Sequence, residues 1–263
     1  MSRKLLAVDI DGTAFDDRGR LGAATKQAFV KASQEGHIIC FVTGRKDIEV
    51  ASMGEDYLCV DYLVLNNGGK VRSSADARVL KNELIEEGDA RSLIVYCLER
   101  DIPLHVMSGM DWAINRMTPA ALRYARQLGR SPRLFHSVEE VRCERPEAFM
   151  ATSGGEQVGE FIGRAGLHLT CVQSEPLCMD IVREGVTKWA GIHFLADLLG
   201  IATAQVVAVG NYTNDIELLL RAGTGVAVRN ALPDVKAVAD YVTARDNNHD
   251  AVVEVVERCV LSQ

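Results

Sequence analysis

Short apolar runs alternate with amphipathic stretches at both ends of the chain. An apolar run at 5–10 is followed by a helical pattern over 21–35, and two further strand-like runs complete the first part of the sequence. The alternation returns in the last third, where the spacing of apolar residues predicts helices at 186–199, 215–222 and 250–260. Strands separated by helices are typical of parallel βαβ units. Both ends of the chain therefore predict one α/β domain with a doubly wound, Rossmann-like parallel sheet.

The middle of the chain has a different pattern. Strand-like runs such as 103–107 and 111–117 follow one another with no helix between them. Strands joined by short connections pair in antiparallel fashion. We therefore expect an α+β domain over 82–184, inserted into an α/β core formed by 1–81 and 185–263.

Composition limits the partners that the protein can bind. The chain has 263 residues, of which 48% are hydrophobic, and this is enough to bury the cores of two domains. Its 36 acidic and 29 basic residues give a formal net charge of −7. Nucleic acids and anionic membranes attract basic proteins, so we expect neither as a partner. The sequence carries no signature of an oligomeric state.

The cysteines and the start of the chain bear on the compartment. The seven cysteines are odd in number and form no C-x-x-C pair, so we expect reduced residues in the core. Only four residues precede the first strand-like run, which leaves no room for a signal peptide. No apolar stretch approaches the length of a membrane span. We therefore expect a cytoplasmic protein.

Two aspartates one residue apart end the first strand-like run. In a strand, Asp9 and Asp11 project to the same side, and Gly12 lets the backbone turn after them. A solvated strand end followed by an Asp-Gly turn would have the same sequence. The pair alone therefore does not distinguish a site from a turn.

Polar residues also follow three other predicted strands of the α/β domain. They are T-G-R at 43–45, N-N-G at 66–68 and G-N-Y-T-N-D at 210–215, and Lys188 lies in the first turn of a predicted helix. Each of these is an ordinary turn or surface sequence when taken singly. Ligands of open α/β sheets bind beyond the carboxyl ends of the strands, where all these groups meet. Carboxylates, a hydroxyl, a lysine and helix N-termini at one edge predict a divalent cation with a phosphate beside it.

These motifs resemble those of the haloacid dehalogenase-like (HAD) hydrolase superfamily, and specifically its Cof-type branch. D-x-D-G-T, T-G-R, G-x-x-K and G-N-x-x-N-D occur in the order of that branch, between Asp9 and Asp215. The resemblance implies a Rossmann-like HAD core with a C2-type α+β cap between the second and third motifs. It also implies an Mg²⁺-dependent phosphatase that hydrolyses a small phosphorylated metabolite, with a sugar phosphate as the expected substrate.

The resemblance implies a role for each residue of the motifs. Asp9 would attack phosphorus and form an aspartyl-phosphate, and Asp11 would protonate the leaving oxygen and then activate water. The groups expected to hold phosphoryl oxygens are Thr43, the backbone of Gly44, Lys188 and Asn214. Mg²⁺ would be held by Asp9, the main-chain carbonyl of Asp11, Asn211 and Asp215. Arg45 and Asn67 lie at the same strand ends, where they either touch substrate or anchor loops.

One position departs from the family pattern. The fourth motif usually reads G-D-x-x-N-D, and this chain has Asn211 at the first acid. An amide oxygen is a weaker Mg²⁺ ligand than a carboxylate, so Asp215 would bind the metal directly or through water.

Two alternatives to a phosphatase remain open at this stage. Phosphomutase-type phosphotransfer would share the chemistry of Asp9, and a metabolite-binding or regulatory protein with weakened catalysis would explain Asn211. A nucleotide-binding dehydrogenase is excluded because no G-x-G-x-x-G follows the first strand. The inserted domain offers six candidates for substrate contacts, with Trp112 better suited to packing: His105, Trp112, Arg116, Arg123, Arg126 and Arg133.

Overall fold

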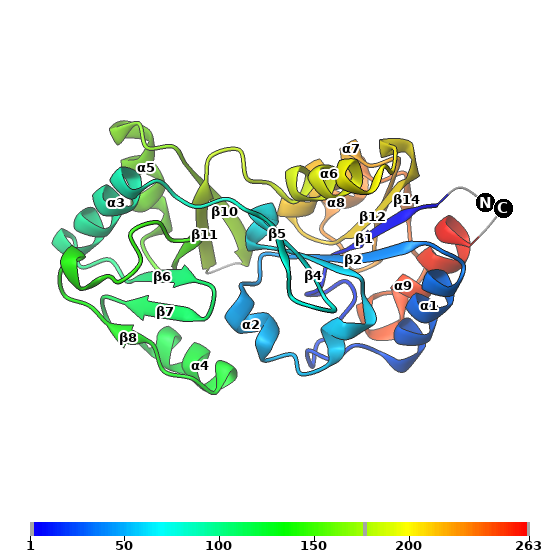
Figure 1. The fold of residues 1–263 in the computed structure, drawn as a ribbon, viewed down its shortest axis with the longest axis horizontal. Helices are drawn as coiled ribbons and strands as arrows, with labels where there is room; N and C mark the ends of the chain where they lie inside the picture. The colour runs from blue at the N-terminus through cyan, green and yellow to red at the C-terminus, as the bar shows by residue number, and fades with distance from the viewer. Residues whose placement is uncertain (1–2, 176–177, 262–263) are drawn as a thin grey trace. The chain divides into compact units, whose positions relative to one another are not determined.

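The protein divides into two compact units in a computed structural model that describes residues 3–175 and 178–261 (Figure 1). The first unit contains Met1–Thr43, Glu55–Lys81 and Thr187–Gln263. The second contains Gly44–Gly54 and Asn82–Val186. The chain therefore passes from one unit to the other after residues 43, 54, 81 and 186.

A single eight-stranded sheet, in the order β14-β13-β12-β1-β2-β3-β4-β5, organises the first unit. From β14 to β3 neighbouring strands are parallel, and β4 is antiparallel to β3. Every residue of β1, β2 and β12 is buried, as expected for parallel strands covered on both faces. The strands are β1 (Leu5–Val8), β2 (Ile38–Val42), β3 (Tyr62–Leu65), β4 (Lys70–Ser73), β5 (Val79–Asn82), β12 (Val206–Gly210), β13 (Thr224–Ala227) and β14 (Tyr241–Val242).

Helices cover both faces of this sheet. Helix α1 (Ala23–Gln34) packs with α9 (Ala251–Val255) and the π-turn that continues it over Val256–Val260. Helix α6 (Lys188–Leu199) packs with α7 (Ile216–Arg221), and α7 packs with α8 (Pro233–Val238), on the other face (Figure 1). The predicted doubly wound α/β domain is confirmed.

The second unit has a six-stranded sheet in the order β10-β11-β9-β6-β7-β8, antiparallel except for the parallel pair β7–β8. Two neighbouring residues of β6, Val106 and Met107, lie on opposite faces of the sheet: Val106 packs in one hydrophobic core and Met107 packs with Trp112 in another. The strands are β6 (Leu104–Ser108), β7 (Asp111–Ile114), β8 (Arg133–Leu134), β9 (Ala148–Ala151), β10 (Leu169–Glu175) and β11 (Cys178–Arg183). The helices are α2 (Asp47–Ala51), α3 (Glu87–Glu99), α4 (Pro119–Leu128) and α5 (Gly155–Ala165).

Residues 44–54, which the sequence pattern assigns to the core, cluster with the second unit. Ile48 of α2 is 3% exposed and packs in the same hydrophobic cluster as Trp112. Lys46 donates a 2.6 Å hydrogen bond from Nζ to Asp180 Oδ1 on β11, and both side chains are buried. Separating this segment from the second unit would remove the buried ion pair between Lys46 and Asp180.

Two other sequence expectations concern cysteines and membranes. All seven cysteines are free. None of the helices in residues 3–175 and 178–261 has the length and hydropathy needed to cross a lipid bilayer.

The second unit contains a buried histidine. His105 on β6 is fully buried, and its Nδ1 accepts a 3.2 Å hydrogen bond from Trp112 Nε1. The ring of Tyr124 on α4 lies against both residues. Burial, together with the positive charge of Lys46, lowers the pKa of His105 to about 4.

We expect acid to destabilise the second unit through His105. The pKa of His105 is about 4 in the folded unit and 6.5 in an unfolded chain, so between these pH values the unfolded chain binds a proton that the folded unit does not. Stability is therefore complete above pH 6.5 and decreases as the pH falls, by about 3 kcal/mol in total. Urea unfolding measured from pH 7 to 4 in a Trp189→Phe background tests this, because Trp112 then reports on the second unit alone.

The matched variant is His105→Gln, which keeps an acceptor for Trp112 and does not titrate. Between pH 7 and 4, the free energy of unfolding of this variant should fall by about 3 kcal/mol less than that of the protein with His105. Equal pH dependence in the two proteins would show that His105 is not the titrating group.

Candidate active site

The end of β1 places Asp9 in the interior of the first unit. Asp9 N donates to Val209 O of β12 at 3.0 Å, so residue 9 continues the pairing of the central strands. Its side chain is 7% exposed. The Oδ1 atom of Asp9 accepts a 2.7 Å hydrogen bond from Lys188 Nζ. Within the described residues the structure shows no hydrogen bond to Asp9 Oδ2, so this oxygen can contact a ligand.

Helix α6 presents Lys188 to this carboxylate from its first turn. Thr187 caps the helix by accepting a 3.1 Å hydrogen bond at Oγ1 from Ala190 N. Gly68, at the end of the turn that follows β3, lies so close that a Cβ there would be 1.9 Å from Thr187 O. A glycine at this position therefore sets how closely the start of α6 approaches the sheet edge.

Asp215 completes a charged triplet. Lys188 Nζ donates to Asp215 Oδ1 at 2.6 Å, and the two side chains are almost fully buried. Asp215 Oδ2 accepts from Asn211 N at 2.9 Å and Tyr212 N at 3.1 Å, which closes the turn after β12. A Cβ on Gly210 would lie 2.4 Å from Asp215 Cγ, so this turn needs a residue without a side chain.

Burial and charge act in opposite directions on this triplet. Burial raises the pKa of Asp9 well above its usual range, although the positive charge of Lys188 lowers it. Burial alone would lower the pKa of Lys188, but Asp215 and Asp9 outweigh it and hold that pKa above its ordinary value. The lysine therefore stays charged at neutral pH, and a second cation near Asp9 would favour the carboxylate form.

A second group of predicted residues meets beyond β2 and β3. Thr43 N donates to Val64 O at 2.9 Å, and Thr43 O accepts from Asn67 N at 3.0 Å. Asn67 Oδ1 accepts a 3.0 Å hydrogen bond from Asn214 Nδ2. Asn66 and Asn67 both have positive φ, near 50°, which asparagine tolerates better than most residues. The strand ends thus bring Thr43, Asn67 and Asn214 together.

Asp11 lies on the turn that leaves β1. Its side chain is exposed, whereas Thr13, Ala14 and Phe15 after it are buried. Gly12 has a φ of +71°, and a Cβ there would be 2.4 Å from Asn211 Nδ2. Asn211 therefore packs directly against the residue that follows Asp11.

The residues of this edge suit a hard divalent cation. The Asp9 carboxylate, Asp11 and the Asn211 amide supply oxygen atoms at this edge, and oxygen ligands are those that Mg²⁺ prefers. No group of three His, Cys, Asp or Glu side chains within 3–175 and 178–261 is arranged to hold a metal ion by itself. The fit therefore depends on amide and main-chain oxygens as well as carboxylates.

Other candidate residues lie in the second unit. Gly44 and Arg45 follow Thr43 directly in the chain but cluster with that unit. His105 and Trp112 are buried against each other, as described above. Arg116 forms an ion pair with Asp101. These contacts give His105, Trp112 and Arg116 structural partners within their own unit.

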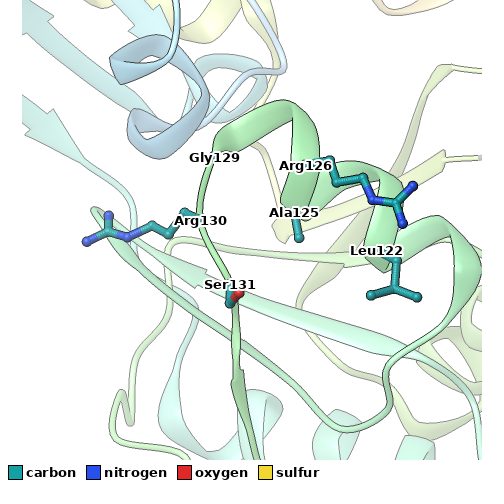
Figure 2. A pocket seen from close by; sticks show the side chains of 6 residues that line it. All are labelled: Leu122, Ala125, Arg126, Gly129, Arg130 and Ser131. Atoms are coloured by element: carbon teal, nitrogen blue, oxygen red, sulfur yellow. The ribbon is translucent and has the colours of Figure 1, made fainter.

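The arginines near the end of α4 do not converge on one point. A hollow of about 350 Å³ is lined by Leu122, Ala125, Arg126, Gly129, Arg130 and Ser131. Figure 2 shows that Arg126 extends beside Leu122, whereas Arg130 extends in the opposite direction. Arg133 forms an ion pair with Asp111 at 3.2 Å, and Arg123 is exposed. This hollow therefore lacks the paired arginines that would hold a single phosphate.

Two asparagines next to the Asp11 turn could not be identified from the sequence pattern. Asn230 Nδ2 donates to Gly12 O at 2.8 Å, and Asn247 Nδ2 donates to Phe15 O at 3.1 Å. They lie 218 and 232 residues from their partners, in segments without a motif. Only the position of Asn230 directly beyond a strand end could have drawn attention to it.

Comparisons with known proteins bear on the family and the fold. A family model for haloacid dehalogenase-like hydrolases matches residues 6–256. YxeH of Bacillus subtilis is 28% identical over 276 residues, covering 99% of both chains. An HMP-PP phosphatase of Cronobacter sakazakii is 26% identical over 251 residues, covering 89% of this chain and 87% of its own. The crystal structure of a haloacid dehalogenase-like hydrolase from Bacteroides thetaiotaomicron has a TM-score of 0.86 at 20% identity, covering 98% and 99% of the two chains.

The charged triplet predicts a large loss of stability when its cation is removed. Lys188→Met leaves the buried carboxyl groups of Asp9 and Asp215 with no cation between them. The free energy of unfolding should fall by about 3–5 kcal/mol. Urea unfolding in a Trp112→Phe background measures this, because Trp189 then reports on the first unit.

Two further variants separate this effect from a general loss of charge. Lys26→Met removes an ion pair of similar length, 2.6 Å to Asp56, but with 42% and 26% of the two side chains exposed, and should change stability by about 1 kcal/mol or less. Adding Asp9→Asn to Lys188→Met should restore part of the loss. Similar effects of Lys188→Met and Lys26→Met would contradict the role of burial.

Proposed function

This chain belongs to the haloacid dehalogenase-like hydrolase family, as a phosphoric monoester hydrolase, and from that premise we propose that it is a Mg²⁺-dependent phosphatase of small phosphorylated metabolites. The observation that supports this most strongly is the buried Asp9–Lys188–Asp215 triplet beside the exposed Asp11. It supplies a carboxylate nucleophile, a fixed cation and a separate acid at one edge of the sheet.

Asp9 and Asp11 divide the chemistry between them. In this proposal Asp9 Oδ2 attacks phosphorus, and an aspartyl-phosphate forms as the ester oxygen departs. Asp11 donates its proton to that oxygen and afterwards accepts a proton from the water that attacks the aspartyl-phosphate. The exposure of Asp11 supports this second role, because water and the leaving alcohol can reach it.

The remaining residues hold the phosphoryl group. Lys188 stays protonated between two carboxylates, so it can offset the negative charge of phosphoryl oxygens next to Asp9. Thr43 and Asn214 are tied to Asn67, one through its backbone and the other through its side chain. We assign phosphate binding to Lys188, Thr43, the backbone of Gly44 and Asn214, with Arg45 and Asn67 as further contacts.

We propose that Mg²⁺ is held by Asp9, the main-chain carbonyl of Asp11, Asn211 and Asp215. Bound there, the ion would supply positive charge that favours the ionised form of Asp9 and screens the phosphoryl oxygens. Both oxygens of Asp215 already accept hydrogen bonds, which favours a role through water for this residue. Asn211 lies against Gly12, and this position supports its place in the set.

We assign the second unit the role of a cap that selects the substrate and excludes water from the reaction. An α+β insertion within a hydrolase core supports this assignment. A sugar phosphate is the substrate class that we propose to test first, and HMP-PP belongs in the same panel because a relative is named for it. Product analysis distinguishes hydrolysis from transfer of the phosphoryl group to a second sugar.

The test of this function is phosphate release from a panel of alkyl and aryl phosphate esters, with and without Mg²⁺. Wild-type protein should release phosphate only with the metal. Asp9→Asn should abolish turnover with the fold intact, because an amide cannot accept the phosphoryl group. Asp11→Asn should abolish the hydrolysis of alkyl phosphates. The same variant should still be phosphorylated slowly at Asp9 by p-nitrophenyl phosphate, because its leaving group needs no proton. Normal turnover of an alkyl phosphate by either variant would overturn these roles.

Asn211 provides a separate prediction about the metal. Asn211→Asp restores a carboxylate at the presumed site, and we expect tighter Mg²⁺ binding by about 1–3 kcal/mol, or one to two decades. Turnover at limiting Mg²⁺ should rise, and the difference should shrink at saturation. Titration of activity against Mg²⁺, with circular dichroism as the control for folding, measures this. Unchanged metal dependence would place Asn211 away from the metal.

A further inference from the structure

The loop that carries Asp11 is fastened to the opposite end of the chain. Asn230, just beyond β13, donates from Nδ2 to Gly12 O at 2.8 Å and accepts at Oδ1 from Asn247 N at 3.1 Å. The carbonyl that it holds belongs to the residue directly after Asp11. A single asparagine thus links the Asp11 turn to the segment 246–250.

Asn247 holds the same loop at two further points. Its Nδ2 donates to Phe15 O at 3.1 Å and to Asp17 Oδ1 at 2.9 Å. The side chain is 7% exposed, so its hydrogen bond to Phe15 O is shielded from water. Replacement of this residue would remove the hydrogen bonds from its Nδ2 atom to Phe15 O and Asp17 Oδ1.

The segment that presents Asn247 is itself fixed. Asp246 caps its 3₁₀ turn, Asn247–His249, by accepting from Asn248 N at 3.1 Å. Asp250, at a φ of +57°, accepts at Oδ1 a 3.0 Å hydrogen bond from Thr25 Oγ1 near the start of α1. The segment 246–250 is therefore attached to helix α1, which follows the Asp11 loop, as well as to the loop itself.

We propose that Asn230 and Asn247 form an asparagine clamp, whose function is to position Asp11 for proton transfer. Gly12 has a left-handed φ and no side chain, so its backbone can change conformation more easily than that of other residues, and the hydrogen bond from Asn230 restricts it. The exposed Asp11 side chain is placed by that backbone, and proton transfer requires the acid within hydrogen-bond reach of the leaving oxygen. The inference rests on the proposed function of Asp11, and the clamp residues are positioning residues that touch no substrate.

The dependence of the rate on the leaving group tests this role. kcat/KM reports the steps up to the formation of the aspartyl-phosphate, in which Asp11 acts only as an acid. Asn230→Ala should lower kcat/KM for an alkyl phosphate by about tenfold or more, but for p-nitrophenyl phosphate by about threefold or less, at saturating Mg²⁺. Asn247→Ala should show the same difference between the two substrates. The difference measured for Asp11→Asn is the largest that loss of the acid can cause. An equal loss on both substrates, or none, would overturn the proposal.

Asn248→Ala is the matched control. Asn248 donates from Nδ2 to Asp17 Oδ2 at 3.0 Å, on the exposed part of the same loop. Within residues 3–175 and 178–261 it forms no hydrogen bond with Gly12 or Phe15. The Asn248→Ala variant should have kcat/KM values for both substrates within about twofold of those of the wild-type protein. A leaving-group split as large as that of Asn230→Ala would show general loop damage and overturn the specific role of the clamp.

Hydrogen exchange provides a readout that does not depend on catalysis. Thr13 N, Ala14 N and Phe15 N all donate to Ile10 O within the loop, so their exchange reports its opening. Asn230→Ala and Asn247→Ala should speed exchange in peptides covering residues 10–17 by about tenfold, with the midpoint of urea unfolding unchanged for Asn230→Ala. Unchanged exchange would overturn the clamp. A wild-type protein that releases no phosphate from any ester would instead contradict the proposed function.

Discussion

One buried ammonium group constrains the whole active-site edge. Lys188 is 2% exposed, and a cation so far from water is stable only with anionic partners at hydrogen-bond distance. Those partners are Asp9 and Asp215, which lie 179 and 27 residues away in the chain. The end of β1, the first turn of α6 and the turn after β12 must all be in place before the charge is satisfied. The native order of the central strands is therefore a condition for burying this lysine.

The fold and the charged triplet follow from features that a sequence displays directly. Buried parallel strands are read from continuous apolar runs, and helices from their spacing, so the α/β sheet and the antiparallel sheet were both predictable. Topology then brings the ends of parallel strands to one edge, which is why Asp9, Lys188 and Asp215 could be expected to meet. No side-chain geometry was needed for that conclusion.

Other features depend on tertiary packing and escaped prediction. Lys46 and Asp180 are 134 residues apart, and nothing in either local sequence indicates the partner. Ile48 looks like an ordinary apolar residue of the core, yet it packs with Trp112 in the second unit. Asn230 and Asn247 are polar residues in loops, where a solvated side chain is the usual outcome. In each case the residue type was visible and its partner was not, because the pairing depends on how distant segments pack.

The path of residues 44–54 bears on how this enzyme can be taken apart and recombined. An inserted domain joined at two points can be moved to another scaffold as one cassette. Here the chain passes between the two units at four points. The short segment 44–54 contributes Lys46 and Ile48 to the interior of the second unit, together with residues 82–186. A chimaera that exchanges only 82–186 would bring Asp180 into a foreign protein without Lys46. Whether the second unit of one protein can be combined with the first unit of another therefore depends on residues 44–54. These eleven residues lie in the N-terminal quarter of the chain, outside the region being exchanged.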